Sequence, residues 1–326
     1  MMSSEAVPQG RRFKGYDIIG DVHGCGETLA RLLEKMHYRR SDQGYWHPER
    51  QAVFLGDIID RGPRIREALA IVRAMVDSGA ARMILGNHEF NALAYCTPAP
   101  PEFERDYLRP HTPRNARQMA ETLEQFADHP TEWADYLDWF QRLPLFIEWP
   151  HFRVVHACWD AELIERHRAR CGGGHFDRQF LVESAQRGTL AARTKQRLTS
   201  GVDLPLPEGM SIVSSDGVER QNFRTKFWAP DASTYGELLF QPDPLPEGVA
   251  RKPIEPEHRE EMVTYGPAEK LLFVGHYWLK GSPEPIASNI ACLDYSAVKF
   301  GRLVAYRLDD ERQLMPEKFV WSYVDP

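Results

Sequence analysis

Carboxylate, imidazole and amide side chains recur directly after short apolar runs in this sequence. The segments that follow these runs are GDVHG, GDIIDRG, GNHE, HACWD and GHYW. Hard and borderline divalent cations bind such groups, and hydrolysis at phosphorus is served best by two cations about 3.5–4 Å apart. The candidate ligands are Asp21, His23, Asp57, Asn87, His156 and His276. The sequence therefore predicts a paired-metal site, provided that folding brings these six side chains together.

Three copies of one pattern between Tyr16 and Glu89 would position the first four of these residues. Each copy has a short apolar run, a polar turn containing glycine, and a stretch with helical periodicity, as in YDII, GDVHGCGE and TLARLLEKM. Such repetition predicts parallel strands with helical crossovers, and ligands gather at the carboxyl ends of such strands. We expect the three turns to share one edge, with Asp21 and His23 on the same side of an extended segment.

Each candidate taken singly has an ordinary structural explanation. A lone histidine after a strand is commonly a hydrogen-bonded structural residue. Gly-Asp and Gly-Asn pairs are common in turns because glycine admits positive φ. The joint occurrence of the candidates, each after its own strand, favours the metal-binding interpretation. Cys25 in GDVHGC is interpreted as a small buried residue at a helix start, and not as a thiolate ligand or nucleophile.

The whole chain, residues 1–326, is expected to form a single domain that carries two insertions. Residues 98–143, rich in Glu, Arg, Trp and Tyr, are predicted to form a helical cap. Residues 160–268 are predicted to be a variable insertion, with weak periodicity and a proline-rich stretch. Strands are expected in LFIEWP, FRVVH, KLLFVGHYW, IACLDYS and RLVAYRL.

Composition limits the class of protein and its partners. A chain of 326 residues with 42% hydrophobic and 27% charged residues is typical of a soluble globular protein. Its net charge of −7 argues against strong general binding to nucleic acid, which depends on clustered Lys and Arg. We find neither a secretory signal in the first 17 residues nor an apolar stretch long enough to cross a membrane. Five cysteines without a CxxC pair favour reduced thiols and a cytoplasmic location.

The blocks GDVHG, GDIIDRG and GNHE resemble the three signature blocks of the phosphoprotein phosphatase branch of the calcineurin-like metallophosphoesterase superfamily. The resemblance is dense over residues 16–96, and His156 and His276 support it later in the chain. Bacterial diadenosine tetraphosphatases, PrpE-type enzymes and polynucleotide phosphatase modules look most similar in length and in the GDVHGC opening. The resemblance implies one metallophosphoesterase domain with an α/β fold: two mixed sheets face to face, helices outside, and the metals at one edge.

The resemblance also implies how two metals would be held. The first metal would be bound by Asp21, His23 and Asp57, and the second by Asp57, Asn87, His156 and His276, with Asp57 as the bridge. Manganese is the favoured metal, and iron, zinc or a mixed di- and trivalent pair are alternatives.

Roles in the reaction are implied in the same way. His88 would be the general acid, Asp60 would orient it, and Arg61 and Asn87 would bind the substrate phosphate. A water activated by the two metals would attack phosphorus. The superfamily often ends in a Gly-His-x-His block, but Trp278 stands where the second histidine would be. Relatives also bring a second phosphate-binding arginine; Arg224 is one candidate for it, and a surface residue is the alternative interpretation.

Metal-dependent hydrolysis of a phosphate ester or phosphoanhydride is therefore the expected function. A nucleotide-type substrate such as a diadenosine polyphosphate is favoured. A Ser/Thr or Tyr protein phosphatase and a polynucleotide end-phosphatase stay open as alternatives. A catalytically inactive metal-binding scaffold that recognises a phosphorylated partner is the alternative from a different class. Tyr295, after a late strand, could reach the phosphate or lie at the edge of the core.

Overall fold

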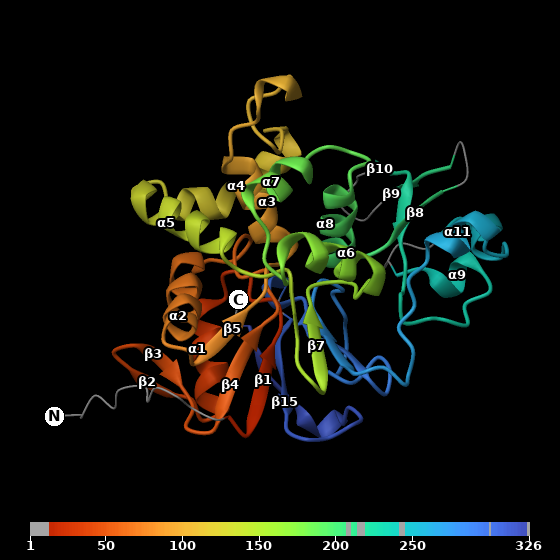
Figure 1. Cartoon of the computed structure of the whole chain (residues 1–326). Helices are drawn as coiled ribbons and strands as arrows, with labels where there is room; N and C mark the ends of the chain where they lie inside the picture. The colour runs from red at the N-terminus through yellow and green to blue at the C-terminus, as the bar shows by residue number, and fades with distance from the viewer. Residues whose placement is uncertain (1–12, 207–209, 214–218, 241–244, 300, 325–326) are drawn as a thin grey trace.

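Two mixed β-sheets lie face to face in the computed structural model, with helices around them (Figure 1). The structure describes residues 13–206, 210–213, 219–240, 245–299 and 301–324. Most of the N-terminal run in which we found no secretory signal lies outside the described residues. Among the described residues, no helix has both the length and the apolar character needed to cross a membrane.

The first sheet carries the strands of the three repeated units. Its order is β14-β15-β1-β4-β5, and β16 pairs with β15. Strands β1, β4 and β5 are mutually parallel, whereas β15 is antiparallel to β1. The strands are β1 (Gly15–Ile19), β4 (Arg50–Phe54), β5 (Ala81–Met83), β14 (Asp294–Tyr295), β15 (Arg302–Leu308) and β16 (Phe319–Tyr323).

The second sheet is built from later parts of the chain. Its order is β13-β12-β7-β6, in which β7, β12 and β13 are parallel and β6 is antiparallel to β7. The strands are β6 (Phe146–Glu148), β7 (Phe152–Val155), β12 (Leu271–Val274) and β13 (Ile290–Cys292). All five apolar runs predicted after residue 143 contain strands, and the predicted fold class is confirmed.

Alternating side chains along the strands build two separate cores. Ile18 and Val53 belong to the cluster between the sheets, together with Phe273 from the second sheet. Their neighbours Ile19 and Phe54 belong to the other cluster, in which the helices take part. Successive strand residues point to opposite faces, so the near-continuous apolar runs of the sequence correspond to strands that are covered on both sides.

A helix follows each of the three polar turns, as the periodicity predicts. These helices are α1 (Gly26–Lys35), α2 (Ile65–Asp77) and α3 (Asn87–Cys96). The leucines at 29, 32 and 33 form the buried face of α1. Because α3 starts at Asn87, the third turn and the amino end of a helix coincide.

Residues 98–143 contain one short 3₁₀ helix and two α-helices. These are η1 (Pro101–Phe103), α4 (Pro113–Gln125) and α5 (Pro130–Gln141). The Thr112 hydroxyl caps α4 by accepting a hydrogen bond from the Asn115 amide, and a proline starts each α-helix, where its missing N–H costs nothing. Figure 1 shows α3, α4 and α5 together beyond one end of the sheets.

Residues 160–268 hold more regular structure than their weak periodicity indicated. Their helices are α6 (Ala161–Cys171), α7 (Arg178–Glu183), α8 (Leu190–Ser200), α9 (Tyr235–Leu238), α10 (Glu247–Ala250) and α11 (Pro256–Glu261). Their strands are β8 (Asp203–Pro205), β9 (Ile212–Val213), β10 (Glu219–Arg220) and β11 (Asn222–Arg224), which form two small antiparallel pairs. Elsewhere lie a hairpin of β2 (Arg39–Ser41) and β3 (Gly44–Trp46), η2 (Ala297–Lys299) and η3 (Pro316–Lys318).

Candidate active site

The six candidate ligands all follow the carboxyl ends of parallel strands. Asp21 and His23 come after β1, Asp57 after β4, and Asn87 after β5 in the first sheet. His156 follows β7 and His276 follows β12 in the second sheet. The two sheets therefore contribute to one edge, where parallel α/β sheets present their ligand sites.

Backbone hydrogen bonds lock the first two turns together. The amides of Val22 and His23 both donate to the Asp57 carbonyl, at 3.1 and 2.8 Å. The prediction that residues 21–23 are extended is wrong at His23, whose φ of 43° is left-handed. His23 Nε2 nevertheless lies 4.0 Å from Asp21 Oδ2, because the turn, and not an extended strand, brings the two side chains together.

Glu89 joins the third turn to the second. Its buried carboxylate accepts hydrogen bonds from the amides of Asp57 (2.8 Å), Ile58 (2.7 Å) and Gly86 (3.0 Å). We assigned no role to this residue from the sequence, although it stands in the GNHE block. Its partners explain why a carboxylate belongs there: it satisfies amides that the two turns would otherwise leave unpaired in the interior.

Asp57, Asn87, His156 and His276 converge on one another. His156 Nε2 lies 3.1 Å from Asn87 Oδ1 and 3.3 Å from Asp57 Oδ2. His276 Nδ1 lies 2.8 Å from the same Asn87 oxygen. Asp57, His156 and His276 are so placed that one cation could contact all three, and the same holds for His23, Asp57 and His88. Asp57 is the residue common to both groups.

Hydrogen bonding of the histidines shows that these side chains fit cations. His156 Nδ1–H donates to the Leu55 carbonyl at 2.7 Å, so in the neutral ring Nε2 presents a lone pair to the oxygens of Asn87 and Asp57. His23 Nδ1–H likewise donates to the Ile59 carbonyl at 2.9 Å. His276 Nε2 is buried and has no hydrogen-bond partner among the described residues. Buried acceptors that face other acceptors are stabilised by a cation between them.

The electrostatics of the cluster lead to the same conclusion. Burial opposes protonation of His156, but the Asp57 carboxylate outweighs it and raises the pKa of His156 to about 10. Burial, together with the neighbouring Asp294 carboxylate, raises the pKa of Asp21 well above its ordinary value. Burial and the nearby Arg224 lower the pKa of His276. A divalent cation would balance the excess of buried carboxylates.

His88 and Asp60 form a second, adjoining arrangement. His88 Nδ1–H donates to Asp60 Oδ2 at 2.6 Å, and both side chains are buried. His88 Nε2 is turned to the other side, 3.1 Å from Nη2 of Arg61. The other terminal nitrogen of Arg61 lies 3.0 Å from His23 Nε2. The structure therefore brings His88, Asp60 and Arg61 against the candidate ligands, as expected.

Helix α4 supplies two side chains that the sequence gave no reason to select. The buried Thr122 hydroxyl donates to Asp60 Oδ1, and the Asp60 amide donates to the Thr122 oxygen at 3.1 Å. Gln118 Nε2 lies 3.2 Å from Nδ1 of His88. Thr122 lies 62 residues from Asp60 in the sequence, and Gln118 lies 30 residues from His88. No sequence pattern links residues so far apart, so only the folded chain reveals these contacts.

Strained backbone is concentrated in the same place. Among the described residues, eight non-glycine residues have positive φ, and five of them are His23, Asp57, Asp60, Arg61 and His276. Such conformations cost about 1–3 kcal/mol each and tend to gather at functional sites. Two glycines relieve crowding: a Cβ at Gly86 or Gly275 would collide with Oδ1 of Asp57 or of Asp21.

Three further residues singled out in the sequence are now placed. Arg224 lies near His276, as its effect on the His276 pKa shows, and its Nε is 3.8 Å from Asp203 Oδ1. The Tyr295 hydroxyl accepts a hydrogen bond from the Glu284 amide at 3.1 Å and is largely buried. Cys25 is buried as predicted, and burial raises the pKa of its thiol to about 11.

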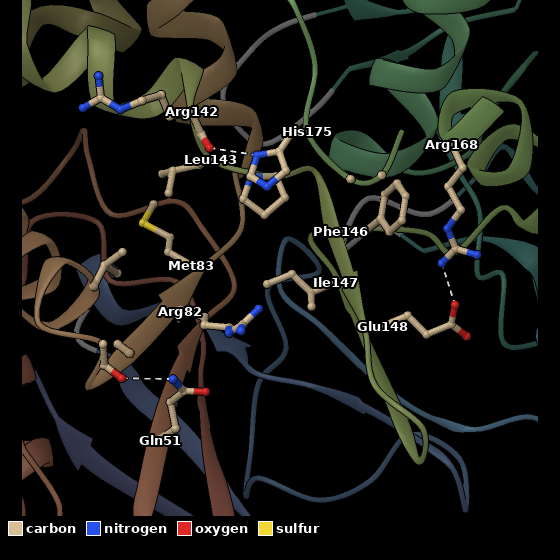
Figure 2. A pocket seen from close by; sticks show the side chains of 16 residues that line it. Gln51, Arg82, Met83, Arg142, Leu143, Phe146, Ile147, Glu148, Arg168 and His175 are labelled. Carbon is tan, nitrogen blue, oxygen red and sulfur yellow. Dashed lines mark hydrogen bonds and ion pairs between the residues drawn. The ribbon is translucent and has the colours of Figure 1, made fainter. Parts of the chain in front are cut away.

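One pocket adjoins this cluster of side chains, and a larger pocket lies apart from it. Arg61 lines a pocket of about 380 Å³ together with the start of α1. A second pocket, of about 630 Å³, lies beside the edge strands β5 and β6 (Figure 2). Its lining includes Arg82, Ile147, His175 and the ion pair of Arg168 with Glu148, and none of the candidate ligands. The second pocket therefore does not belong to the candidate site.

Residues 16–168 match the model of the calcineurin-like phosphoesterase family. Over these residues the chain carries a calcineurin-like phosphoesterase domain. A protein serine/threonine phosphatase from Saccharomyces cerevisiae with similarity to human phosphatase PP5 superimposes with a TM-score of 0.50 at 12% identity. The superposition covers 96% of this chain and 80% of the yeast protein, and it supports the metallophosphoesterase fold.

Curated relatives of this metallophosphoesterase domain are named bis(5'-nucleosyl)-tetraphosphatases. The asymmetrical enzyme PrpE of Halalkalibacterium halodurans is 30% identical over 141 residues, which is 43% of this chain and 54% of the relative. The symmetrical enzyme of Psychromonas ingrahamii is 30% identical over 142 residues, which is 43% of this chain and 42% of the relative. The chain thus spans about half the length of the curated relatives it matches.

Proposed function

We propose that this chain is a metal-dependent phosphohydrolase whose substrate is a nucleotide-type phosphoanhydride such as a diadenosine polyphosphate. The observation that carries the proposal is the convergence of buried carboxylate, amide and imidazole groups, in which His156 Nε2 lies within 3.3 Å of oxygens of both Asn87 and Asp57. The names of the relatives favour the nucleotide substrate. One relative is named asymmetrical and the other symmetrical. The nucleotides released in the reaction would therefore show which phosphoanhydride bond is cleaved.

The residues proposed to hold two metals are those selected from the sequence. Asp21, His23 and Asp57 would hold the first, and Asp57, Asn87, His156 and His276 the second. When bound, the metals supply Lewis-acid activation of water and neutralise charge on the phosphate. Manganese is proposed first, and iron or zinc are the alternatives, because imidazole and carboxylate ligands suit all three.

Arg61 is proposed to bind phosphate oxygens through its fork of donors. One nitrogen of Arg61 donates to His23 Nε2, whose lone pair cannot serve a donor and a cation at once. The guanidinium must therefore leave His23 when a cation binds there, which frees it for the substrate. The pocket of about 380 Å³ beside Arg61 offers space for the part of the substrate beyond the phosphate.

His88 is proposed to protonate the leaving oxygen. Asp60 holds the Nδ1–H of His88 at 2.6 Å, so Nε2 is the nitrogen that meets the substrate. The Asp60 carboxylate thereby fixes the tautomer and orientation of the His88 ring, and the Thr122 hydroxyl keeps that carboxylate in place. We further propose that residues 1–326 work as one domain in the cytoplasm, with 98–143 as its cap and 160–268 as its variable insertion. The five free cysteines support that location.

The test is hydrolysis of diadenosine tetraphosphate by the purified protein, with manganese added and after chelation. We expect turnover with metal and its loss on chelation, and we expect His88→Ala to lower kcat by about 10²–10⁴-fold, the usual contribution of general acid catalysis. His151→Ala is the matched control, because His151 is exposed and has no place in the site. Faster turnover of a phosphopeptide or of a 2′,3′-cyclic nucleotide would contradict the proposed substrate class.

A further inference from the structure

Two cationic side chains lie beside α3, the helix that begins at the candidate ligand Asn87. Lys195 in α8 places its Nζ 3.4 Å from Oδ1 of Asn91 and 5.6 Å from the centre of the Phe90 ring. Asn91 lies one helical turn after Asn87, so both occupy the same face of α3. Figure 1 shows α8 on the same side of the sheets as α3. Lys195 is thereby positioned next to the candidate site by a helix of the variable insertion.

Arg109 is the second cation, and it approaches from the loop before α4. Its Nη2 donates to Gln118 Oε1 at 2.7 Å, and Gln118 Nε2 lies 3.2 Å from Nδ1 of His88. The Arg109 amide donates to the Ala94 carbonyl of α3 at 2.9 Å. Gln118 thus links Arg109 to His88, the proposed general acid.

Aromatic stacking fixes the loop that carries Arg109. The His111 ring is stacked between Tyr95 of α3 and Tyr107, with ring centres 3.7 and 4.1 Å away. His111 Nε2 also donates to the Tyr95 carbonyl at 2.8 Å. A loop anchored in this way holds the backbone of Arg109 beside α3, and the hydrogen bond to Gln118 orients its guanidinium.

Among the described residues no carboxylate lies within 4.0 Å of Lys195 or Arg109, and the Asp60 charge acts on Arg109 only from farther away. Arg109 Nη1 is buried and, within that part of the chain, has no hydrogen-bond partner at all. Burial and the charge of Arg109 lower the pKa of Lys195 to about 8. Both cations lie beside α3, through Asn91 and Ala94, and one of them has an unsatisfied buried donor. Such an arrangement is stabilised by an anion that contacts both.

We propose that Lys195 and Arg109 form a second anion site that binds phosphate groups beyond the one being cleaved. The proposal rests on the proposed function, in which Arg61 and the metals take the scissile phosphate. A guanidinium fork and an ammonium suit phosphate oxygens, and the only polar side chains touching them in the described chain are the amides of Asn91 and Gln118. Lys195 lies outside residues 16–168, so the match to the family assigns it no role.

The site distinguishes polyphosphates from simple monoesters. A monoester carries one phosphate and would leave Lys195 and Arg109 without an anion. A dinucleoside polyphosphate presents further charged groups along the same chain, which these two cations would hold. The chemical class selected is therefore a substrate with at least one additional phosphate adjacent to the scissile group.

Calorimetric titration of the manganese-loaded full chain with inorganic tripolyphosphate and with orthophosphate tests the site. We expect the wild-type protein to bind tripolyphosphate at least tenfold more tightly than orthophosphate. Lys195→Met and Arg109→Gln should each weaken tripolyphosphate at least tenfold and orthophosphate less than threefold. Lys252→Met and Arg312→Gln, at exposed positions, are the matched controls and should resemble wild type. Chelation of manganese by tripolyphosphate is the same for every variant, so differences between variants report on the side chains.

Two results would overturn the second anion site. If tripolyphosphate binding is unchanged in both variants, no such site exists. If both anions weaken in parallel, the two cations act on the scissile phosphate or on the fold. The titration measures binding and needs no turnover. Failure to hydrolyse diadenosine tetraphosphate would therefore contradict the proposed function, whereas the titration alone decides whether the second anion site exists.

Discussion

Asp17 and Asp21 lie four residues apart, one within β1 and one just beyond it, and both are buried. Asp17 is fully paired: Arg50 Nε and Arg307 Nε lie 2.9 and 3.2 Å from Oδ1, and the Tyr38 hydroxyl donates to Oδ2 at 3.0 Å. It is a structural carboxylate, whose charge the folded chain compensates completely.

Asp21 has no such partners. In the described chain its carboxylate accepts only the His276 amide, at 3.2 and 3.4 Å, and it faces the carboxylates of Asp57 and Asp294. Asp294 is a further residue that the sequence gave no reason to select, although CLDYS places it just after β13. The contrast shows that burial alone does not mark a functional acid; burial without a cation hydrogen-bonded to the carboxylate does.

The largest effect is expected from Asp21→Asn. The variant should lose hydrolysis on the order of 10³-fold, because a carboxylate that holds a metal contributes several kcal/mol to the reaction. The metal-free variant should be as stable as wild type or more stable, since the change removes a buried carboxylate that burial and the neighbouring Asp294 and Asp57 carboxylates disfavour. Steady-state kinetics and urea unfolding of the metal-free protein measure the two quantities. A metal-free Asp21→Asn protein that unfolds at much lower urea would remove the distinction from Asp17.

Asp17→Asn should produce the opposite pattern. It leaves Arg307 and Arg50 without their shared carboxylate, and breaking such a buried pair costs about 3 kcal/mol or more of unfolding free energy. Activity per folded molecule should change little, because Asp17 does not touch the candidate site. Urea unfolding followed by circular dichroism gives the stability. Loss of activity in fully folded Asp17→Asn would show that the two carboxylates are not separable.

A smaller effect is expected at Glu148, a second paired carboxylate. Burial alone would raise its pKa, but hydrogen bonds from Lys270, Arg153 and Arg168 outweigh it and lower the pKa to about 2. Between the ordinary glutamate pKa of 4.5 and the folded pKa of about 2, the unfolded state binds more protons at Glu148 than the folded state does. The stabilisation is therefore present above about pH 4.5 and is lost as pH falls towards 2.

Wild type should therefore be more stable than Glu148→Gln at pH 7, by about 1 kcal/mol because two of the partners are exposed to solvent screening. The difference should shrink between pH 4.5 and 2, as followed by thermal unfolding across that range. A difference that stays constant with pH would mean that packing, and not charge, accounts for the effect of Glu148.

The fold, and the strand ends at which most candidate site residues lie, could be predicted because the relevant patterns are local. Each strand, polar turn and helix between Tyr16 and Glu89 lies within about 30 residues, and apolar periodicity defines it directly. Parallel strands then place the turns at one edge by a general rule. The strands that end at His156 and His276 were recognisable in the same way. The conformation of His23 was not, because a left-handed residue other than glycine leaves no mark in composition.

The sequence by itself determined which groups stand at the strand ends and that they suit metals. Only the tertiary structure decided which side chains orient them. Thr122 reaches Asp60 across 62 residues, and Lys195 reaches Asn91 across 104. Such contacts depend on how two insertions fold back over the edge of the sheets, and no local propensity encodes that path. The physical reason is that pairing of buried polar groups is settled by packing in three dimensions, whereas strands and turns are settled by their neighbours in the chain.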